Sequence, residues 1–240
     1  MDVPGYPPGR MVRVYVPQRA RPSNRPLLLL FDGQNVFDDE PSFAGGWRAH
    51  LAVEKLAQNV SPPVVVGVDH GHDRRIAELS PFSFGPHKGG ADGFVAWMAG
   101  WLLPHLRASF AVTHDKRAIT IGGSSMGGLA ALYTHLSMPD TFGGSIAMSP
   151  SLWIARGAMF DWVRERPIPS DARIYLDAGG REPGQMMRGA QSMAELLYRR
   201  GARKLHFRAD PKGAHREADW RKRLPKALRI HFGTSKKRPY

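Results

Sequence analysis

The chain has 240 residues, the length of one domain, and its 42% hydrophobic and 23% charged residues are typical of a folded globular protein. It contains no cysteine, which excludes disulfides, zinc–thiolate sites, iron–sulfur clusters and a thiol nucleophile. No run of about 18 apolar residues is present, so we expect no membrane span. The start of the chain shows no secretory signal pattern, so the expected location is cytoplasmic.

The charge is concentrated at one end of the sequence. The whole chain carries a net charge of +13, and residues 199–240 hold 15 basic and 3 acidic residues, a net of +12. We interpret this region as a solvated basic helix followed by a flexible basic tail over 233–240. No basic motif with interleaved aromatic residues is present, so no nucleic-acid partner is expected. Binding to nucleic acid or to a membrane surface through the basic end is the alternative.

Predicted strands and helices alternate along the chain. In chain order we predict strands over 11–17, 27–31, 64–68, 117–122, 145–149, 172–178 and 205–210, and helices over 47–58, 92–110, 126–137, 189–200 and 220–232. Residues 70–90 are rich in Gly, Pro, His and Arg and predict a long irregular loop. The alternation predicts a single α/β domain over 1–240, with a mainly parallel sheet flanked by helices. Ligands of such sheets bind at the carboxyl ends of the strands.

The sharpest motif is Gly123-Ser124-Ser125-Met126-Gly127, which matches G-x-S-x-G. It follows an apolar strand and opens an alanine-rich helix, which is the setting that a nucleophile elbow requires. The small glycines allow the tight turn and leave Ser125 at its tip as a candidate nucleophile. The N–H of Met126 would then point toward a developing oxyanion.

A serine nucleophile needs a base, and four histidines follow Ser125 in the sequence. His135, His206 and His231 fall inside predicted helices or strands. His215 alone falls in a loop directly after a strand, where its ring could lie over the serine. We therefore predict His215 as the general base.

The acid that orients the histidine is expected after the strand over 172–178. Glu182 lies in the loop that follows this strand and is the favoured candidate. Asp177 lies within the strand and Asp210 follows a later strand, and both stay open as alternatives.

A second oxyanion donor is expected in the loop after an early strand. Phe31 is followed by Asp-Gly-Gln-Asn, in which the N–H of Gln34 is the expected donor and Asn35 a candidate substrate-binding residue. The acidic residues Asp32, Asp38, Asp39 and Glu40 do not have the spacing of a calcium loop, and no histidine pair has zinc-ligand spacing, so we expect no metal. Nucleotide-binding glycine motifs are absent, and we expect no cofactor.

Eight stretches of the sequence resemble the esterase family of α/β-hydrolases, the group of the esterase D type and the enterochelin (siderophore) esterases. The group also contains feruloyl and acetylxylan esterases and the mycolyltransferases. The stretches occur in family order and lie at 31–39, 42–47, 65–69, 75–81, 122–129, 148–153, 174–182 and 213–220. The resemblance covers nearly the whole chain from about residue 11 to 232.

The resemblance implies an α/β-hydrolase fold and a serine esterase that acts on a small-molecule carboxylic ester through an acyl-enzyme. No cap insertion of appreciable size is visible in the sequence, so we expect no large cap domain. The family nucleophile, base and acid fall on Ser125, His215 and Glu182, and the oxyanion amides on Met126 and Gln34. Trp153 resembles a family position that lines the pocket. An acyltransferase with the same triad, or a non-catalytic binding protein on the same fold, are the alternatives.

Overall fold

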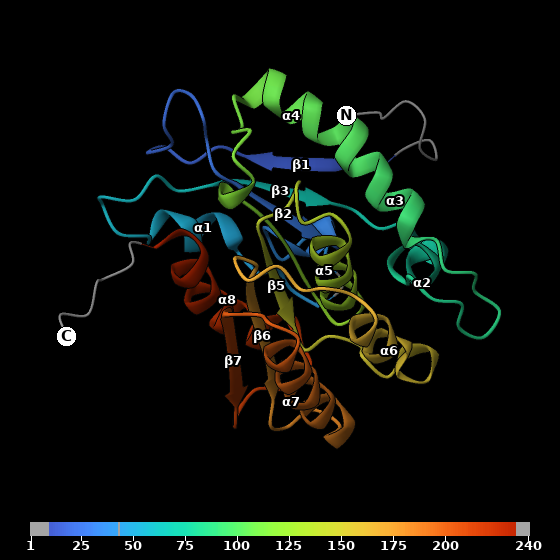
Figure 1. Ribbon diagram of the computed structural model, residues 1–240. Coiled ribbons are helices and arrows are strands. Elements are labelled where there is room, and N and C mark those ends of the chain that lie inside the picture. The colour runs from blue at the N-terminus through green and yellow to red at the C-terminus, as the bar shows by residue number, and fades with distance from the viewer. Residues whose placement is uncertain (1–9, 43, 234–240) are drawn as a thin grey trace.

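The computed structural model describes residues 10–42 and 44–233, and the strands in these ranges form one seven-stranded sheet (Figure 1). The strands are β1 (Val12–Tyr15), β2 (Leu27–Phe31), β3 (Val64–Val68), β4 (Ile119–Ser124), β5 (Gly144–Met148), β6 (Arg173–Gly179) and β7 (Lys204–Asp210). Their spatial order is β1-β3-β2-β4-β5-β6-β7. Only the β1–β3 pairing is antiparallel, which confirms the predicted mainly parallel sheet.

Helices cover both faces of the sheet. They are α1 (Ala49–Glu54), α2 (Arg75–Leu79), α3 (Ala91–Trp97), α4 (Leu103–Phe110), α5 (Met126–Ser137), α6 (Ala158–Arg164), α7 (Gly184–Arg199) and α8 (Glu217–Phe232). A π-helical turn, Met98–Leu102, joins α3 to α4 in one continuous run. No helix within the described ranges is both long and apolar enough to cross a membrane.

The alternating side chains of β2 show how the two layers are built. Leu27, Leu29 and Phe31 belong to the apolar cluster beneath α2 to α7, whereas Leu28 and Leu30 belong to the cluster beneath α1 and α8. A strand buried on both faces reads as a continuous apolar run, which is why the pentapeptide has no polar member. Each fully buried leucine contributes about 1.5–3 kcal/mol.

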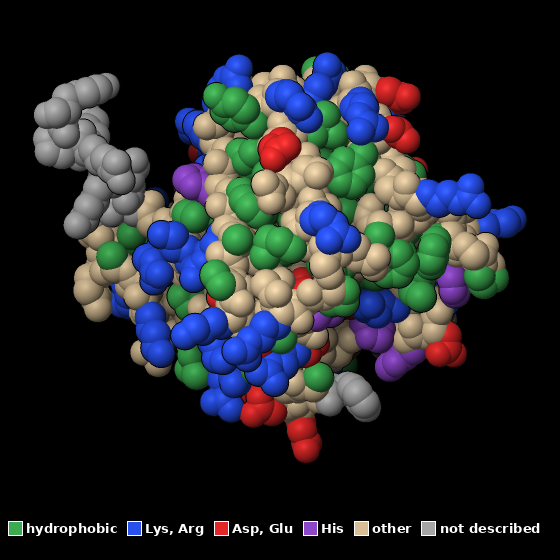
Figure 2. Space-filling view, turned by 90° about the horizontal axis from the view of Figure 1, so that it is seen from below, with side chains coloured by type: hydrophobic (Ala, Val, Ile, Leu, Met, Phe, Trp, Pro, Cys, Tyr) green, Lys and Arg blue, Asp and Glu red, His purple; other side chains and the backbone are tan. Residues whose placement is uncertain are grey.

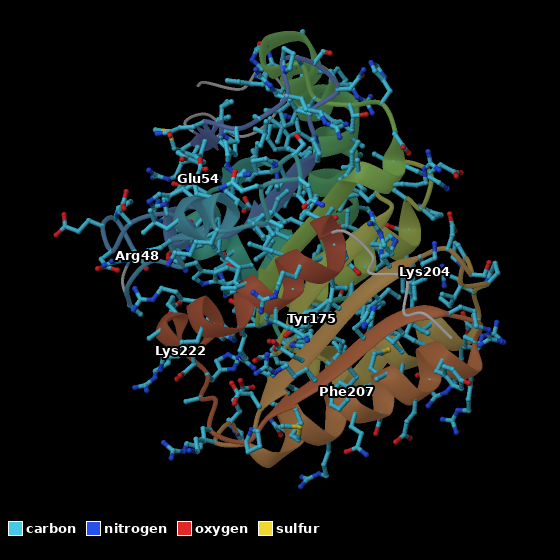
Figure 3. All side chains as sticks on the ribbon, turned by 90° about the vertical axis from the view of Figure 1, so that its left-hand side faces the viewer. Arg48, Glu54, Tyr175, Lys204, Phe207 and Lys222 are labelled. Atoms are coloured by element: carbon cyan, nitrogen blue, oxygen red, sulfur yellow. The ribbon has the colours of Figure 1, made fainter. Side chains whose placement is uncertain are left out.

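Figure 3 shows the other end of the sheet, where β7 is the outer strand and α8 crosses the face in front of it. Phe207 of β7 is partly exposed at this edge, whereas Tyr175 of β6 is buried and packs in the cluster with α8.

Several predicted boundaries are wrong for local reasons. The helix predicted over 47–58 begins only at Ala49, because Arg48 has positive φ and the N–H of Trp47 is bound by the carbonyl of Asn35. The strand predicted over 117–122 starts two residues later and continues through Ser124. The segment 70–90 is not wholly irregular, since it contains α2.

Further differences lie in the second half of the chain. Helix α7 begins at Gly184, directly after Pro183, five residues before the predicted start. Helix α8 begins at Glu217, three residues before its predicted start, and α6 was not predicted. The flexible tail predicted over 233–240 lies, apart from Gly233, outside the described residues.

Candidate active site

Ser125 occupies a strained turn between β4 and α5. Its backbone has φ 55° and ψ −120°, a conformation that non-glycine residues rarely adopt and that clusters at active sites. The turn is so tight that a Cβ placed on Gly123 would lie 2.6 Å from the carbonyl carbon of Gly127. The sequence therefore supplies glycine where the strand and the helix approach, and the serine is left at the tip of the elbow.

His215 reaches this tip from the loop between β7 and α8. Its Nε2 lies 3.0 Å from Ser125 Oγ, within hydrogen-bond reach. The imidazole also packs edge-on against the buried indole of Trp220, with ring centroids 4.8 Å apart. The loop is thus placed by the first turn of α8, and its histidine faces the serine.

Glu182 lies in the loop that follows β6, with its carboxylate buried. Its Oε2 is 3.5 Å from His215 Nδ1, and its Oε1 accepts hydrogen bonds from Ser149 Oγ at 2.5 Å and from Arg223 Nη2 at 3.3 Å. Burial alone would raise the pKa of Glu182, but the hydrogen bonds from His215 and Ser149 and the charge of Arg223 hold this pKa below its usual value. The carboxylate is therefore ionised near neutral pH.

A close backbone approach brings the Glu182 and His215 loops together. A Cβ on Gly179 would lie 2.3 Å from the carbonyl oxygen of Gly213, and the N–H of Arg181 donates to that same carbonyl. Glycine at the end of β6 is thus required for the two loops to touch.

The other carboxylates that the sequence left open lie elsewhere. Asp177 is fully buried in β6, where it accepts from the Tyr175 hydroxyl at 2.9 Å and pairs with Arg223 at 3.0 Å. The carboxylate of Asp210 accepts from the N–H of Lys212. Among the described residues, Glu182 is the carboxylate that contacts His215.

The remaining histidines after Ser125 lie in the core or at the surface. His135 is buried in α5 and contacts Ser145 Oγ at 2.9 Å, and His231 is buried in α8 near Thr120. His206 lies on the outer strand β7.

The two backbone amides predicted as oxyanion donors lie at the starts of two helical turns. Met126 is the first residue of α5, and Gln34 lies in a short 3-10 turn, Gly33–Asn35; the first N–H groups of a helix have no acceptor within it. Asp32 holds this turn through a bidentate pair with Arg75, both bonds 2.7 Å long. A Cβ on Gly127 would lie 3.1 Å from that Asp32 carboxylate, which places the 3-10 turn against the elbow.

Ser125 and His215 open into a cavity of about 210 Å³. Its other lining residues are Ser151, Trp153, Pro183, Gln185 and Met186. Ser151 Oγ lies 3.2 Å from Ser125 Oγ, and the indole of Trp153 is 44% exposed and packs on Phe84. Trp153 was the one lining residue predicted besides the triad. Ser151 lies in the matched stretch 148–153, whereas Gln185 and Met186 carry no pattern that would have marked them.

Trp153 also borders a second, wider cavity of about 440 Å³ that Arg156, Phe160 and Arg164 help to line. Asn35 lines neither cavity, and its side-chain amide instead lies 3.5 Å from the carboxylate of Glu217.

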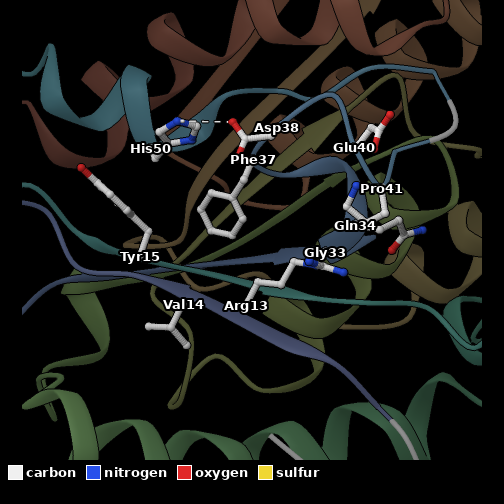
Figure 4. Close-up of a pocket in the computed structure, with 10 residues that line it drawn as sticks. All are labelled: Arg13, Val14, Tyr15, Gly33, Gln34, Phe37, Asp38, Glu40, Pro41 and His50. Carbon is white, nitrogen blue, oxygen red and sulfur yellow. Dashed lines mark ion pairs between the residues drawn. The ribbon is translucent and has the colours of Figure 1, made fainter.

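The side chain of Gln34 faces a different cavity, of about 250 Å³ (Figure 4). Phe37, Arg13 and His50 also line that cavity, which shares no lining residue with the cavity at Ser125. The side chain of Gln34 therefore does not face the cavity at Ser125, and the role of its backbone N–H as an oxyanion donor stays a prediction.

The acidic residues after β2 are dispersed among separate partners. Asp32 pairs with Arg75, Asp39 pairs with Arg48, and Asp38 faces His50 at 3.9 Å. No group of three or more His, Asp or Glu side chains within the described ranges is arranged to hold a metal ion.

The face toward which β5, β6 and β7 point carries much positive charge, and Figure 2 shows Lys and Arg side chains gathered on part of it. Near the proposed site, Arg216 directly follows His215 and precedes α8, and Arg221 and Lys222 lie in the first turns of that helix. Arg216 and Lys222 both pair with Asp219, and Arg221 lies 3.7 Å from Asp39.

The mainly parallel sheet, the strand–elbow–helix turn and the loops at the carboxyl ends of the strands define the α/β-hydrolase fold. Solved structures similar to this chain include enterobactin esterases. The family model described as "Putative esterase" matches residues 8–231. The chain belongs to this esterase family.

Individual curated relatives carry the names of esterases. The chain is 28% identical over 227 residues to an iron(III) salmochelin esterase of Escherichia coli, covering 88% of this chain and 52% of the relative. It is 40% identical over 156 residues to the ferri-bacillibactin esterase of Bacillus subtilis, covering 55% of this chain and 49% of the relative. The chain thus spans about half the length of these curated relatives.

Solved structures agree over most of the chain. An enterobactin esterase of Shigella flexneri, determined in the presence of enterobactin, superposes with a TM-score of 0.74 at 26% identity, covering 91% of this chain and 54% of the other. A BES protein from Bacillus cereus has a TM-score of 0.76 at 23% identity and covers 92% and 88% of the two chains, a likeness of fold.

Proposed function

We propose that this protein hydrolyses carboxylic esters, with Ser125 as nucleophile, His215 as general base and Glu182 as the acid. The observation that carries the proposal is the 3.0 Å contact between Ser125 Oγ and His215 Nε2 at the tip of a strained elbow. Family membership and the names of the relatives support the same reaction class.

The reaction proceeds in two halves. His215 Nε2 takes the hydroxyl proton as Ser125 Oγ attacks the ester carbonyl, and the imidazolium then gives that proton to the departing alkoxide. The acyl group remains on Ser125. A water molecule, deprotonated by the same nitrogen, attacks the acyl carbonyl and releases the acid, and Ser125 regains its proton.

Groups of the protein stabilise the two charges that develop during the reaction, the oxyanion and the imidazolium. The Met126 and Gln34 amides stabilise the carbonyl oxygen as it becomes an oxyanion, an effect of order 3 kcal/mol per donor. The buried carboxylate of Glu182 stabilises the imidazolium and fixes the ring tautomer that leaves Nε2 unprotonated.

For the substrate we propose an iron(III)-loaded siderophore ester of the enterobactin type. The names of the relatives motivate this class, and iron(III) is part of the substrate. The wider cavity beside Trp153 supports it chemically, because the exposed indole offers a stacking surface for an aromatic ring and Arg156 offers positive charge beside it. Arg164 of the same cavity is paired with Asp161.

The proposal is tested with wild type, Ser125→Ala and the control Ser192→Ala, which removes an exposed serine from α7. Turnover of p-nitrophenyl butyrate and cleavage of iron(III)-enterobactin are measured, the latter by mass spectrometry. We expect Ser125→Ala to lose at least about 10⁴-fold in kcat and the control to lose nothing.

Equal turnover by wild type and Ser125→Ala would refute the assignment of the nucleophile. Transfer of the butyryl group to added glycerol in preference to water would identify an acyltransferase instead. The absence of both turnover and fluorophosphonate labelling at Ser125 would favour a non-catalytic binding protein. The cytoplasmic location stays a prediction.

A further inference from the structure

A buried arginine lies behind Glu182 and is shared between two carboxylates. Arg223 of α8 is 1% exposed, with Nη1 3.0 Å from Asp177 Oδ1 and Nη2 3.3 Å from Glu182 Oε1. Ser149 bridges the group, since its Oγ accepts from Arg223 Nη2 and from Trp220 Nε1, both at 3.0 Å, and donates to Glu182. Of the two carboxylates bound by Arg223, Glu182 alone has a role in the proposed esterase reaction.

The charges of this cluster have a definite balance. A guanidinium paired only with Glu182 would cancel the negative charge that His215 needs when its ring is protonated. With Asp177 on the other nitrogen, two carboxylates and one guanidinium leave a net charge of −1 in the buried cluster. Protonation of His215 brings the site to neutrality, which matters because uncompensated charge is costly in a buried environment.

We propose that Asp177 is a positioning residue that neutralises Arg223, so that Arg223 can fix the carboxylate of Glu182 without cancelling its charge toward His215. This inference rests on the proposed function, because it gives Asp177 a role in stabilising the imidazolium of that reaction. Asp177 itself touches neither the substrate nor His215.

The groups facing Asp177 come from three elements. Tyr175 of β6 donates its hydroxyl to the carboxylate, and Arg223 of α8 supplies the nearest positive charge. Arg208 is its register partner on β7, but that side chain is exposed to water. Burial raises the pKa of Asp177 to about 6, against the opposing charge of Arg223. Above about pH 6 both carboxylates are therefore ionised and the balance described here is complete.

The test is a double-variant cycle read by the titration of the His215 ring. Asp177→Asn, Arg223→Met and the double variant are compared with wild type, and Asp140→Asn makes the same change at a side chain 96% exposed. The His215 signal is assigned in NMR spectra with a His215→Gln variant. Thermal unfolding of each variant confirms that it is folded, and kcat is measured with p-nitrophenyl butyrate.

Asp177→Asn is expected to move the midpoint of the His215 titration down by about one pH unit and to lower kcat about tenfold. Removing Arg223 as well restores the net charge of −1, so the double variant should return the midpoint to near its wild-type position. Asp140→Asn should change neither. A purely structural role predicts that the double variant is worse than either single one.

Two results would overturn the inference: an unmoved midpoint in Asp177→Asn, or a double variant displaced as far as Asp177→Asn. The NMR readout needs no turnover. A wild type that cleaves no ester, together with a shifted and rescued midpoint, would therefore refute the proposed function while upholding the charge balance. Normal ester cleavage with an unmoved midpoint would uphold the proposed function and refute the charge balance.

Discussion

Replacing Glu182 with glutamine removes the charge that faces His215 while keeping the side chain's size. Glutamine can still accept the hydrogen bond of Ser149 and contact Arg223, and Asp177 remains to pair with that arginine. The variant therefore isolates the stabilisation of the imidazolium from the packing of the buried cluster.

The size of the effect follows from the 3.5 Å separation between Glu182 Oε2 and His215 Nδ1. Two unit charges at this distance attract by about 5 kcal/mol at the effective dielectric constant of about 20 that suits such sites. The imidazole side chain is 33% exposed, so solvent screening reduces this value, and we take about half of it. About 2.5 kcal/mol corresponds to a loss of about 100-fold in kcat, with KM nearly unchanged.

The assay is the pH–rate profile of wild type, Glu182→Gln and Asp177→Asn on p-nitrophenyl butyrate. We expect Glu182→Gln to lose about 100-fold across the plateau and Asp177→Asn about tenfold. If Glu182→Gln kept more than a third of the wild-type kcat while Asp177→Asn lost 100-fold, the acid would be Asp177 and the reasoning from distance would be refuted.

Three further outcomes are expected. Gly123→Ala should lower the free energy of unfolding by several kcal/mol and abolish activity, because the added Cβ would lie 2.6 Å from Gly127. The control Gly93→Ala in α3 places its Cβ in open space and should leave the protein equally or more stable. Urea denaturation measures both variants. Burial lowers the pKa of His135 to about 3 in the folded protein. The unfolded chain therefore binds one more proton than the folded chain between about pH 6.5 and pH 3, and the free energy of unfolding falls as the pH falls through that window. His135→Gln should reduce the slope of the unfolding free energy against pH by about 1.4 kcal/mol per pH unit. Trp153→Ala should lower kcat/KM on iron(III)-enterobactin about tenfold or more but leave p-nitrophenyl acetate turnover within a factor of two or three, and equal losses on both would contradict a substrate-binding role.

The elbow could be predicted from the sequence because its determinants are local. A buried strand, a tight turn that needs glycine, and a helix of small residues occur within some twenty consecutive positions, and the structure places Ser125 at the tip. The contacts of His215 with Ser125 and Glu182 could also be anticipated, since parallel strands deliver their following loops to one edge of the sheet.

Short helices held by distant partners could not be predicted. Helix α2 has only five residues, too few to show an apolar period, and its Glu78 is buried in a pair with Arg10 at 2.5 Å. The two residues are separated by 68 positions, so no local pattern reveals the pairing. The interpretation of 70–90 as a wholly irregular loop failed for this reason.

In the basic C-terminal region, the sequence also could not show which arginines are buried, and one of them binds a residue of the proposed site. The sequence suggested a solvated basic helix, and Arg216 and Lys222 at the start of α8 are indeed mostly exposed. Arg223, one residue further on, is instead buried because two carboxylates and a serine hydroxyl from other elements replace the water it loses. A charge count cannot distinguish the two kinds of arginine, since only the fold brings Asp177 and Glu182 to this position.

Helix α8 therefore has a buried face and an exposed face with different roles at the proposed site. Its buried face supplies Trp220, which packs against the His215 ring, and Arg223, which binds Glu182, so it supports both His215 and Glu182. Its exposed face carries the positive charge of Lys222. Neutralising Lys222 should change the dependence of kcat/KM on ionic strength for an anionic ester, whereas changes on the buried face should act on kcat, because only the buried face contacts the proposed triad.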